Sequence, residues 1–129
     1  MTPSVQRFVR ATFGDGRRRD ALAFVRDYHA LERRNGPFDD DVLAQQAIGV
    51  VMFHHEFQAS AGGLRRAQEQ RTQGKGRRPS PREIERLKRR MGLSWQTYDA
   101  ALRRLEDLAA ARKPRSFADA ARRAAGVAS

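Results

Sequence analysis

Residues 42–57 read VLAQQAIGVVMFHHEF, and this stretch decides how the chain folds. On a helix it is apolar nearly all round, and Asp39-Asp40-Asp41 just before it provides an N-cap and negative charge at the positive end of that helix. A helix that is apolar on every side needs other elements to cover it. We therefore predict a helix from Val42 to Phe57 that forms the buried centre of the domain.

Two helices are predicted before this central helix. Apolar residues recur at intervals of three and four over residues 5–13, and the segment ends at Gly14-Asp15-Gly16. A second amphipathic pattern runs from about Arg17 to Arg33, and Asn35-Gly36-Pro37 ends it. Both helices have an apolar face that can cover the central helix.

The sequence after residue 57 predicts further, shorter helices. Gly62-Gly63 is expected to end the central segment, and a short basic helix follows from Leu64 to about Arg71. Residues 72–79 (TQGKGRRP) predict a basic loop. Ser80-Pro81-Arg82-Glu83 is a capping box with proline at the first helical position, which marks the start of the next helix.

The C-terminal part predicts a helical hairpin. Gly92 is expected to close the helix that starts at Pro81, and Ser94 to cap the next one, whose apolar face begins at Trp95. A last helix is expected from Ser116, and residues from about 117 to 129 are expected to form a weakly ordered tail. The predicted fold is all-α: one domain over residues 1–129, a compact bundle of about six helices with a basic loop between the central helix region and the C-terminal hairpin.

Composition excludes several classes of protein. Hydrophobic residues make up 40% and charged residues 32%, which is too apolar for a disordered chain and too charged for a membrane protein. The longest apolar run, residues 47–53, is too short to span a bilayer, and the N-terminus lacks a signal pattern, so we expect a cytoplasmic protein. Because there is no cysteine, disulfides, thiolate zinc sites and thiol catalysis are excluded.

Positive charge is concentrated in the middle of the chain. The 26 Lys and Arg against 15 Asp and Glu give a net charge of +11. Residues 1–63 carry eight basic and eight acidic groups, whereas residues 64–90 carry eleven basic groups and three acidic ones. This distribution is typical of phosphate binding, because each Lys or Arg set against a phosphate releases condensed counterions.

The residues predicted to contact a nucleic acid lie in this basic stretch. One group is the short basic helix with Arg65 and Arg66, and a second is the loop, which we expect to become ordered on contact. The third is a ridge at helical spacing on the outer side of the helix that starts at Pro81. Beyond Arg65 and Arg66, the loop and the ridge contribute Lys75, Arg77, Arg78, Arg82, Arg86, Arg89 and Arg90.

Patterns that point to catalysis or metal binding are weak. His54-His55-Glu56 is a poor metal motif, because adjacent residues on a helix point about 100° apart. Asp39-Asp40-Asp41 could hold magnesium, but the start of a helix already explains it. Gly74-Lys75 lacks the earlier glycine of a phosphate-binding loop, since Glu69 stands there. We therefore expect no enzyme activity, cofactor, metal or small-molecule substrate.

Two other functions fit parts of the same pattern. Leu87 to Leu105 also fits a helix-turn-helix with Gly92 in the turn, which predicts a transcriptional regulator that binds an operator as a dimer. Against it, Lys88 stands where a small residue normally lets the two helices cross, and the recognition helix would begin with Trp95. A protein-interaction module whose basic face meets an acidic partner is the third hypothesis.

The order of these elements resembles the small helical subunit of Class 1, Cascade-type CRISPR effector complexes. The resemblance covers about the first 120 residues and is one of pattern, without invariant chemistry. It lies in the segments VQRFVR (5–10), RRRDAL (17–22), AIGVVMFHH (47–55), GLRR (63–66), EIERLKR (83–89) and LRRL (102–105).

This resemblance implies a non-catalytic subunit of an antiviral ribonucleoprotein. Such a subunit would contact guide RNA, target strand or displaced strand through basic residues, without reading sequence, beside other subunits and copies of itself. The residues that match the basic surfaces of the family in kind are Arg65, Arg66, Arg86, Arg89, Arg103 and Arg104.

Overall fold

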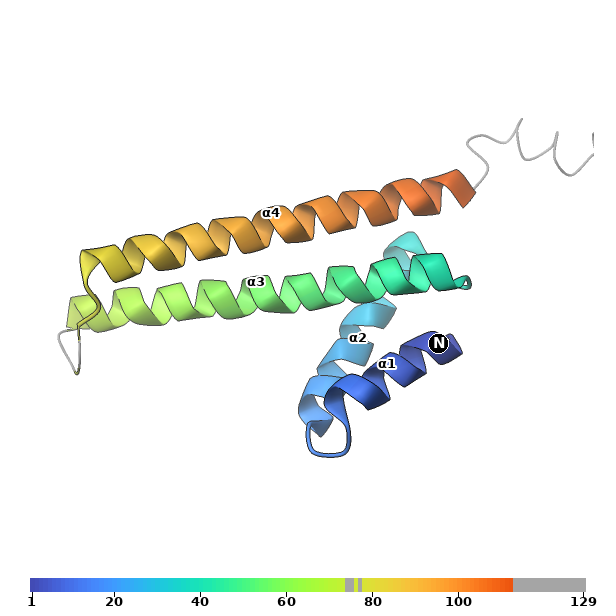
Figure 1. Cartoon of the computed structure of the whole chain (residues 1–129), viewed down its shortest axis with the longest axis horizontal. Helices are drawn as coiled ribbons and strands as arrows, with labels where there is room; N and C mark the ends of the chain where they lie inside the picture. The colour runs from blue at the N-terminus through green and yellow to red at the C-terminus, as the bar shows by residue number, and fades with distance from the viewer. Residues whose placement is uncertain (74–75, 77, 113–129) are drawn as a thin grey trace, which may run out of the picture.

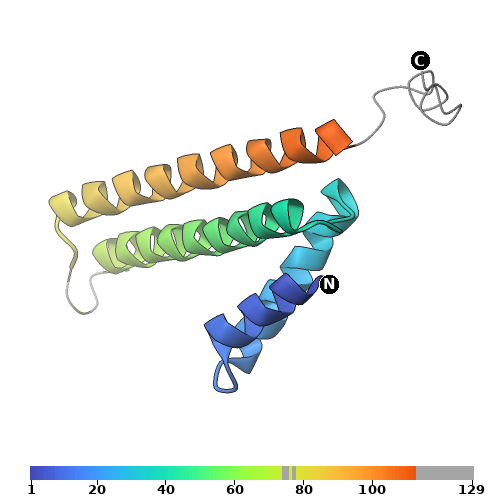
Figure 2. The same ribbon diagram turned by 45° about the vertical axis from the view of Figure 1, so that its right-hand side comes forward.

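The computed structural model describes residues 1–73, 76 and 78–112 of the chain. These residues form four α-helices, α1 (Pro3–Phe13), α2 (Arg18–Asn35), α3 (Asp41–Gln73) and α4 (Pro81–Arg112), and include no strand. The predicted all-α class is confirmed. α3 and α4 lie side by side as a long antiparallel hairpin, and α1 and α2 pack near the N-terminal end of α3 (Figures 1 and 2). None of the described helices has an apolar segment long enough to cross a bilayer.

The predicted count of about six helices is wrong. α3 continues through Gly62-Gly63 and α4 continues through Gly92, where the sequence predicted helix ends. Each glycine costs only about 1 kcal/mol relative to alanine inside a helix, and packing between two long helices outweighs that cost. The short basic helix is the last part of α3, and the predicted C-terminal hairpin is a single helix. The expected helix from Ser116 and the tail lie outside the described residues.

Side chains spaced alternately three and four residues apart join α3 to α4. This 3.5-residue repeat is typical of coiled-coil packing, and its members are buried or half-buried here. Ser60 Oγ lies 3.3 Å from Ser94 Oγ, and Gln46 Nε2 donates a hydrogen bond to the Ala101 carbonyl at 3.0 Å, so the antiparallel register is fixed. The repeat consists of Leu43, Ala47, Val50, His54, Phe57, Ala61 and Leu64 in α3, and of Ile84, Leu87, Met91, Ser94, Tyr98, Ala101, Leu105 and Leu108 in α4.

The apolar core has two parts. The larger part joins α1, α2, the first half of α3 and the last half of α4, and its largest fully buried side chains are Tyr28, Phe24, Phe38, Leu105 and Val5. Burial raises the pKa of Tyr28 to about 12. The predicted burial of the central helix is confirmed in part: five of its apolar residues are buried, four are half-buried and Val42 is exposed. The smaller part lies at the other end of the hairpin, where Leu64 and Ala67 of α3 meet Ile84 of α4. The hairpin therefore extends beyond the region that α1 and α2 cover.

Local capping sets the starts of both long helices, as predicted. The Leu43 N–H donates to Asp40 Oδ1 at 2.9 Å, and the Glu83 N–H donates to Ser80 Oγ at 3.1 Å. Arg112 Nε also donates to Asp40 Oδ2 at 2.6 Å. The backbone hydrogen bond from Leu43, together with Arg112, lowers the pKa of Asp40. Asp40 thus joins the start of α3 to the end of α4.

The helix-turn-helix hypothesis needed a turn at Gly92, and α4 has none there. The Thr97 hydroxyl donates to the Leu93 carbonyl at 3.0 Å, a contact within one turn of continuous helix. Trp95 and the residues after it therefore do not stand at the start of a separate recognition helix. The described residues contain no helix-turn-helix over residues 87–105.

Replacement of Gly92 by alanine tests the continuity of α4. A Cβ at this position would meet no atom within 4 Å, so Gly92→Ala should stabilise the protein by about 1 kcal/mol through helix propensity alone. Urea denaturation followed by circular dichroism measures the change. Gly36→Ala is a control for which we expect the opposite sign. The added Cβ would lie 2.5 Å from the Glu32 carbonyl oxygen, so this substitution should destabilise the protein. A Gly92→Ala variant that lost stability would contradict a continuous α4.

Candidate nucleic-acid interface

Basic residues gather at the end of the hairpin where α3 is connected to α4. The smaller core brings the last turns of α3 beside the first turns of α4, away from α1 and α2 (Figures 1 and 2). The basic side chains that the structure describes on these turns and on the connection are exposed. We call this set the basic tip: Arg65, Arg66, Arg71, Arg78, Arg82, Arg86, Lys88, Arg89 and Arg90.

The structure brings together most of the residues that the sequence predicted. Lys75 and Arg77 lie outside the described residues. Arg103 and Arg104 are exposed on α4, but thirteen residues of helix, or roughly 20 Å, separate Arg103 from Arg90. Arg103 Nε also lies 3.2 Å from Asp99 Oδ2. Arg103 and Arg104 are therefore not part of the basic tip.

Sequence reasoning left Arg71 and Lys88 out of the predicted site. Arg71 stood at the expected end of a short helix, and the antiparallel register of α3 and α4 is what puts it beside the first turns of α4. Lys88 lies among the arginines of α4 and pairs weakly with Glu85, with 3.5 Å between Nζ and Oε1. The seven-residue spacing of the apolar positions across Gly62-Gly63 and Gly92 was the signal that could have revealed this register.

The arginines of the basic tip form no ion pair among the residues that the structure describes, 1–73, 76 and 78–112. At the other end of the molecule, Arg17 lies 3.0 Å from Asp20 and Arg112 lies 2.6 Å from Asp40. The tip therefore presents guanidinium groups whose hydrogen-bond donors are available to a ligand.

The position of these arginines is unfavourable for the folded protein alone. Arg82, Arg86 and Arg90 follow one another at intervals of four, and each such like-charge pair costs roughly 0.2–0.5 kcal/mol. Arg82 also stands in the first turn of α4, where the helix dipole disfavours positive charge. A bound polyanion would offset both terms. Guanidinium groups pair with phosphate oxygens in a bidentate geometry, so a chain of phosphates is the ligand that fits this surface.

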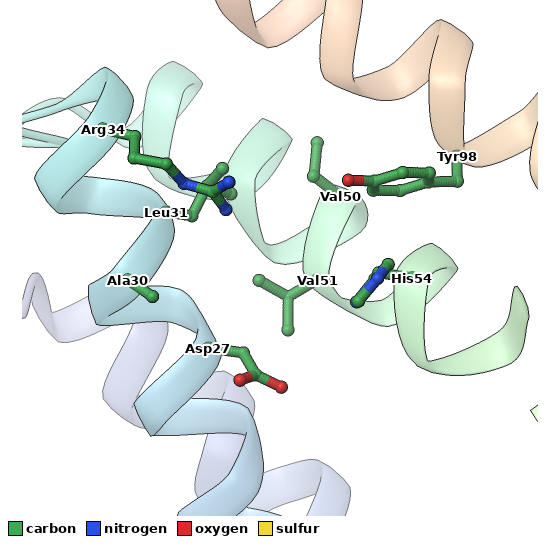
Figure 3. Close-up of a pocket in the computed structure, with 8 residues that line it drawn as sticks. All are labelled: Asp27, Ala30, Leu31, Arg34, Val50, Val51, His54 and Tyr98. Atoms are coloured by element: carbon green, nitrogen blue, oxygen red, sulfur yellow. The ribbon is translucent and has the colours of Figure 1, made fainter. Parts of the chain in front are cut away.

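A small cavity lies between α2, α3 and α4, at the edge of the larger core (Figure 3). Its volume is about 180 Å³, which is below the usual range for a small-molecule site. Its apolar floor comes from Leu31 and Val51, with Ala30 and Val50, and its polar rim from Asp27, Arg34, His54 and Tyr98.

The two adjacent histidines have different partners. His55 Nε2 lies 2.6 Å from Asp27 Oδ2, and this contact joins α3 to α2. Burial by itself would raise the pKa of Asp27, but hydrogen bonds with His55 and Arg26 outweigh it and lower the pKa. The His54 ring instead lies against Tyr98, with 4.9 Å between centroids. Among the described residues no group of His, Asp and Glu is arranged to hold a metal ion.

Four rings form a row along the hairpin, between the cavity and the basic tip. Tyr98 touches His54 on one side and Trp95 on the other, with 5.5 Å between the Tyr98 and Trp95 centroids. Trp95 in turn contacts Phe57 at 5.2 Å. The sequence predicted Trp95 on the inner face of its helix, but 47% of this residue is exposed. Trp95 stands at the edge of the α3–α4 interface, not within it.

No known protein family matches the chain, and comparisons with curated proteins and with solved structures gave no match.

His54 gives the stability of the protein a pH dependence. Burial lowers its pKa below the ordinary value of 6.5, and the neighbouring charges of His55 and Arg34 act in the same direction. The unfolded chain therefore takes up this proton at a higher pH than folded His54 does, so the free energy of unfolding should fall as the pH drops through about 6.5. Asp27 and Asp40 titrate below their ordinary value of 3.8 and do not contribute in this range.

We expect His54→Gln to make this dependence shallower, as measured by urea denaturation between about pH 7.5 and pH 5. Comparison with the unchanged chain removes the contributions of His29 and His55, which are present in both proteins. Equal slopes for the two proteins would show that His54 is as easily protonated in the folded state as in the unfolded one.

Proposed function

We propose that the protein binds the phosphate backbone of a nucleic acid through the basic tip, without reading base sequence and without catalysing a reaction. The observation that carries this proposal is a set of exposed arginines at the end of the hairpin that form no ion pair with the carboxylates of the described part of the chain. Each phosphate contact releases condensed counterions, so binding of this kind weakens strongly as salt rises. Contacts to phosphates fix position on the strand but carry no sequence information.

We further propose that this binding takes place within a ribonucleoprotein assembly in the cytoplasm, as the small subunit of a CRISPR effector complex. The support is the resemblance in the sequence, whose segments fall in α1, α2, α3 and α4. In that setting the basic tip would contact guide RNA, target strand or displaced strand. The helices around the larger core would contact other subunits and further copies of this chain.

Neutralising part of the basic tip should weaken binding evenly across sequences. In the variant Arg82→Gln, Arg86→Gln, Arg89→Gln and Arg90→Gln, the affinity for oligonucleotides of different sequence should fall by at least about tenfold at low salt. The slope of log K against log salt should become shallower by about 0.7–0.9 for each lost phosphate contact. Fluorescence anisotropy over a salt series measures both quantities.

A matched control has the same net charge but leaves the tip intact. Arg7, Arg10, Arg18 and Arg19 are exposed arginines of α1 and α2 without described ion-pair partners, and all four can be replaced by glutamine. This control should keep its affinity. Equal losses in the two variants would show that total charge, and not the basic tip, determines binding, and no loss in either would rule out the proposal.

Purification from the native cell under mild salt tests the assembly. We expect short RNA of uniform length to be present together with several other protein subunits, and the quadruple tip variant to retain less RNA. Mass spectrometry and RNA sequencing identify the components. A preparation free of nucleic acid but bound to an acidic protein would instead support the protein-interaction module.

A further inference from the structure

The aromatic row, which consists of exposed Trp95 and half-buried His54, Tyr98 and Phe57, is a feature that backbone binding does not use. Trp95 is the single tryptophan of the chain and remains 47% exposed, although burial of so large a side chain would stabilise the fold. Its contacts with Phe57 and Tyr98 are tilted, at interplanar angles of 60° and 56°. Tilted rings cover less of the faces of the indole than a parallel stack would.

Positive charge lies on both sides of this row. Lys88 precedes Trp95 by seven residues, which is nearly two full turns, so both side chains lie on the same side of α4 and roughly 10 Å apart along its axis. At the other end of the row, Tyr98 lines the cavity together with Arg34, which forms no ion pair with any described residue (Figure 3). Because Asp27 shares the cavity rim with Arg34, the positive charge that leads an anionic chain toward Trp95 is that of Lys88 and the basic tip.

We infer that the aromatic row is a base-stacking surface, and that the protein prefers unpaired nucleic-acid strands to duplex. This inference rests on the proposed function and adds contact with the bases to contact with the backbone. Bases of a duplex are stacked on each other and cannot reach a side chain on a helix surface, whereas bases of a single strand can. Stacking on aromatic side chains tolerates any sequence, because every base has a flat π face.

Charge favours a nucleic acid over a second copy of the chain as the occupant of this surface. Each copy carries a net charge of +11 and its own basic tip, so two hairpins packed through Trp95 would bring like charges together. A nucleic-acid strand supplies flat rings and negative charge at the same time. The row and the basic tip are complementary to those two properties.

The single tryptophan provides a direct readout. Titration of the full chain with an oligothymidine strand should quench the emission of Trp95, and a blunt duplex of equal length should leave the emission nearly unchanged. Trp95→Ala should lower the affinity for the strand by roughly tenfold, the loss expected for one stacked base, and should change duplex affinity little. Trp95→Phe should recover most of the affinity, because it keeps a ring.

Leu93→Ala is the matched control. Leu93 is 63% exposed and lies two residues from Trp95, which places it on a different side of α4. This variant removes an exposed apolar side chain without touching the row, so it should bind both probes like the unchanged chain. An equal effect of Leu93→Ala and Trp95→Ala would overturn the inference, since it would reflect a general change in α4.

The outcomes separate this inference from the proposed function. If strand and duplex bind equally and Trp95→Ala changes nothing, while the quadruple tip variant still loses affinity, the stacking surface is refuted and backbone binding is retained. If the unchanged chain binds neither probe, both are refuted. If sedimentation shows that Trp95→Ala converts an oligomer into a monomer, a second copy covers the row and the inference is wrong.

Discussion

The packing of α3 against α4 is the constraint on which the rest of the structure depends. Because apolar or small side chains recur every 3.5 residues in both helices, one antiparallel register aligns Leu64 with Ile84 at one end and Asp40 with Arg112 at the other. A shift of one helical turn would break these contacts together. The same register determines which basic side chains become neighbours. On the first half of α3 it leaves one face that α4 does not contact, and α1 and α2 cover that face. Core, cavity and basic tip are therefore consequences of a single interface.

Local signals in the sequence predicted the helices well, and non-local packing decided where they end. The starts at Asp40 and Ser80 depend on hydrogen bonds within three residues, so the sequence contains all the information about them. The stops predicted at Gly62-Gly63 and Gly92 were wrong, because the penalty for a glycine is local whereas the contacts that pay for it come from residues far away in the chain. The exposure of Trp95 was missed for a related reason: periodicity shows which side of a helix is apolar, but not how far the partner helix reaches round it.

Some features of the candidate site were also predictable from local sequence, whereas others depended on contacts between distant residues. Eleven basic residues fall within 27 residues of sequence, so a basic region was predictable, but the antiparallel pairing of α3 and α4 is what brings their arginines together at one end. Whether those arginines are neutralised was not, since ion pairs such as that between Arg112 and Asp40 join residues far apart in the chain. Arg103 and Arg104 were predicted to belong to the site because they are also arginines, but residue type gave no information about how far along α4 they lie from the basic tip. Backbone neutralisation and the aromatic row together describe a surface suited to a flexible polyanion with flat rings.

The hairpin is also long enough that charges at one end are screened from charges at the other. Asp41 and Arg65 are separated by 24 residues of one straight helix, or roughly 36 Å. Ions in the cell screen charges beyond about 8 Å, so the acidic residues at the start of α3 cannot lower the positive potential at the far end. A charged neighbour that docks on α1 or α2 would consequently not alter the hold of the arginines on a phosphate chain. Charges at the two ends of the hairpin therefore act independently of each other.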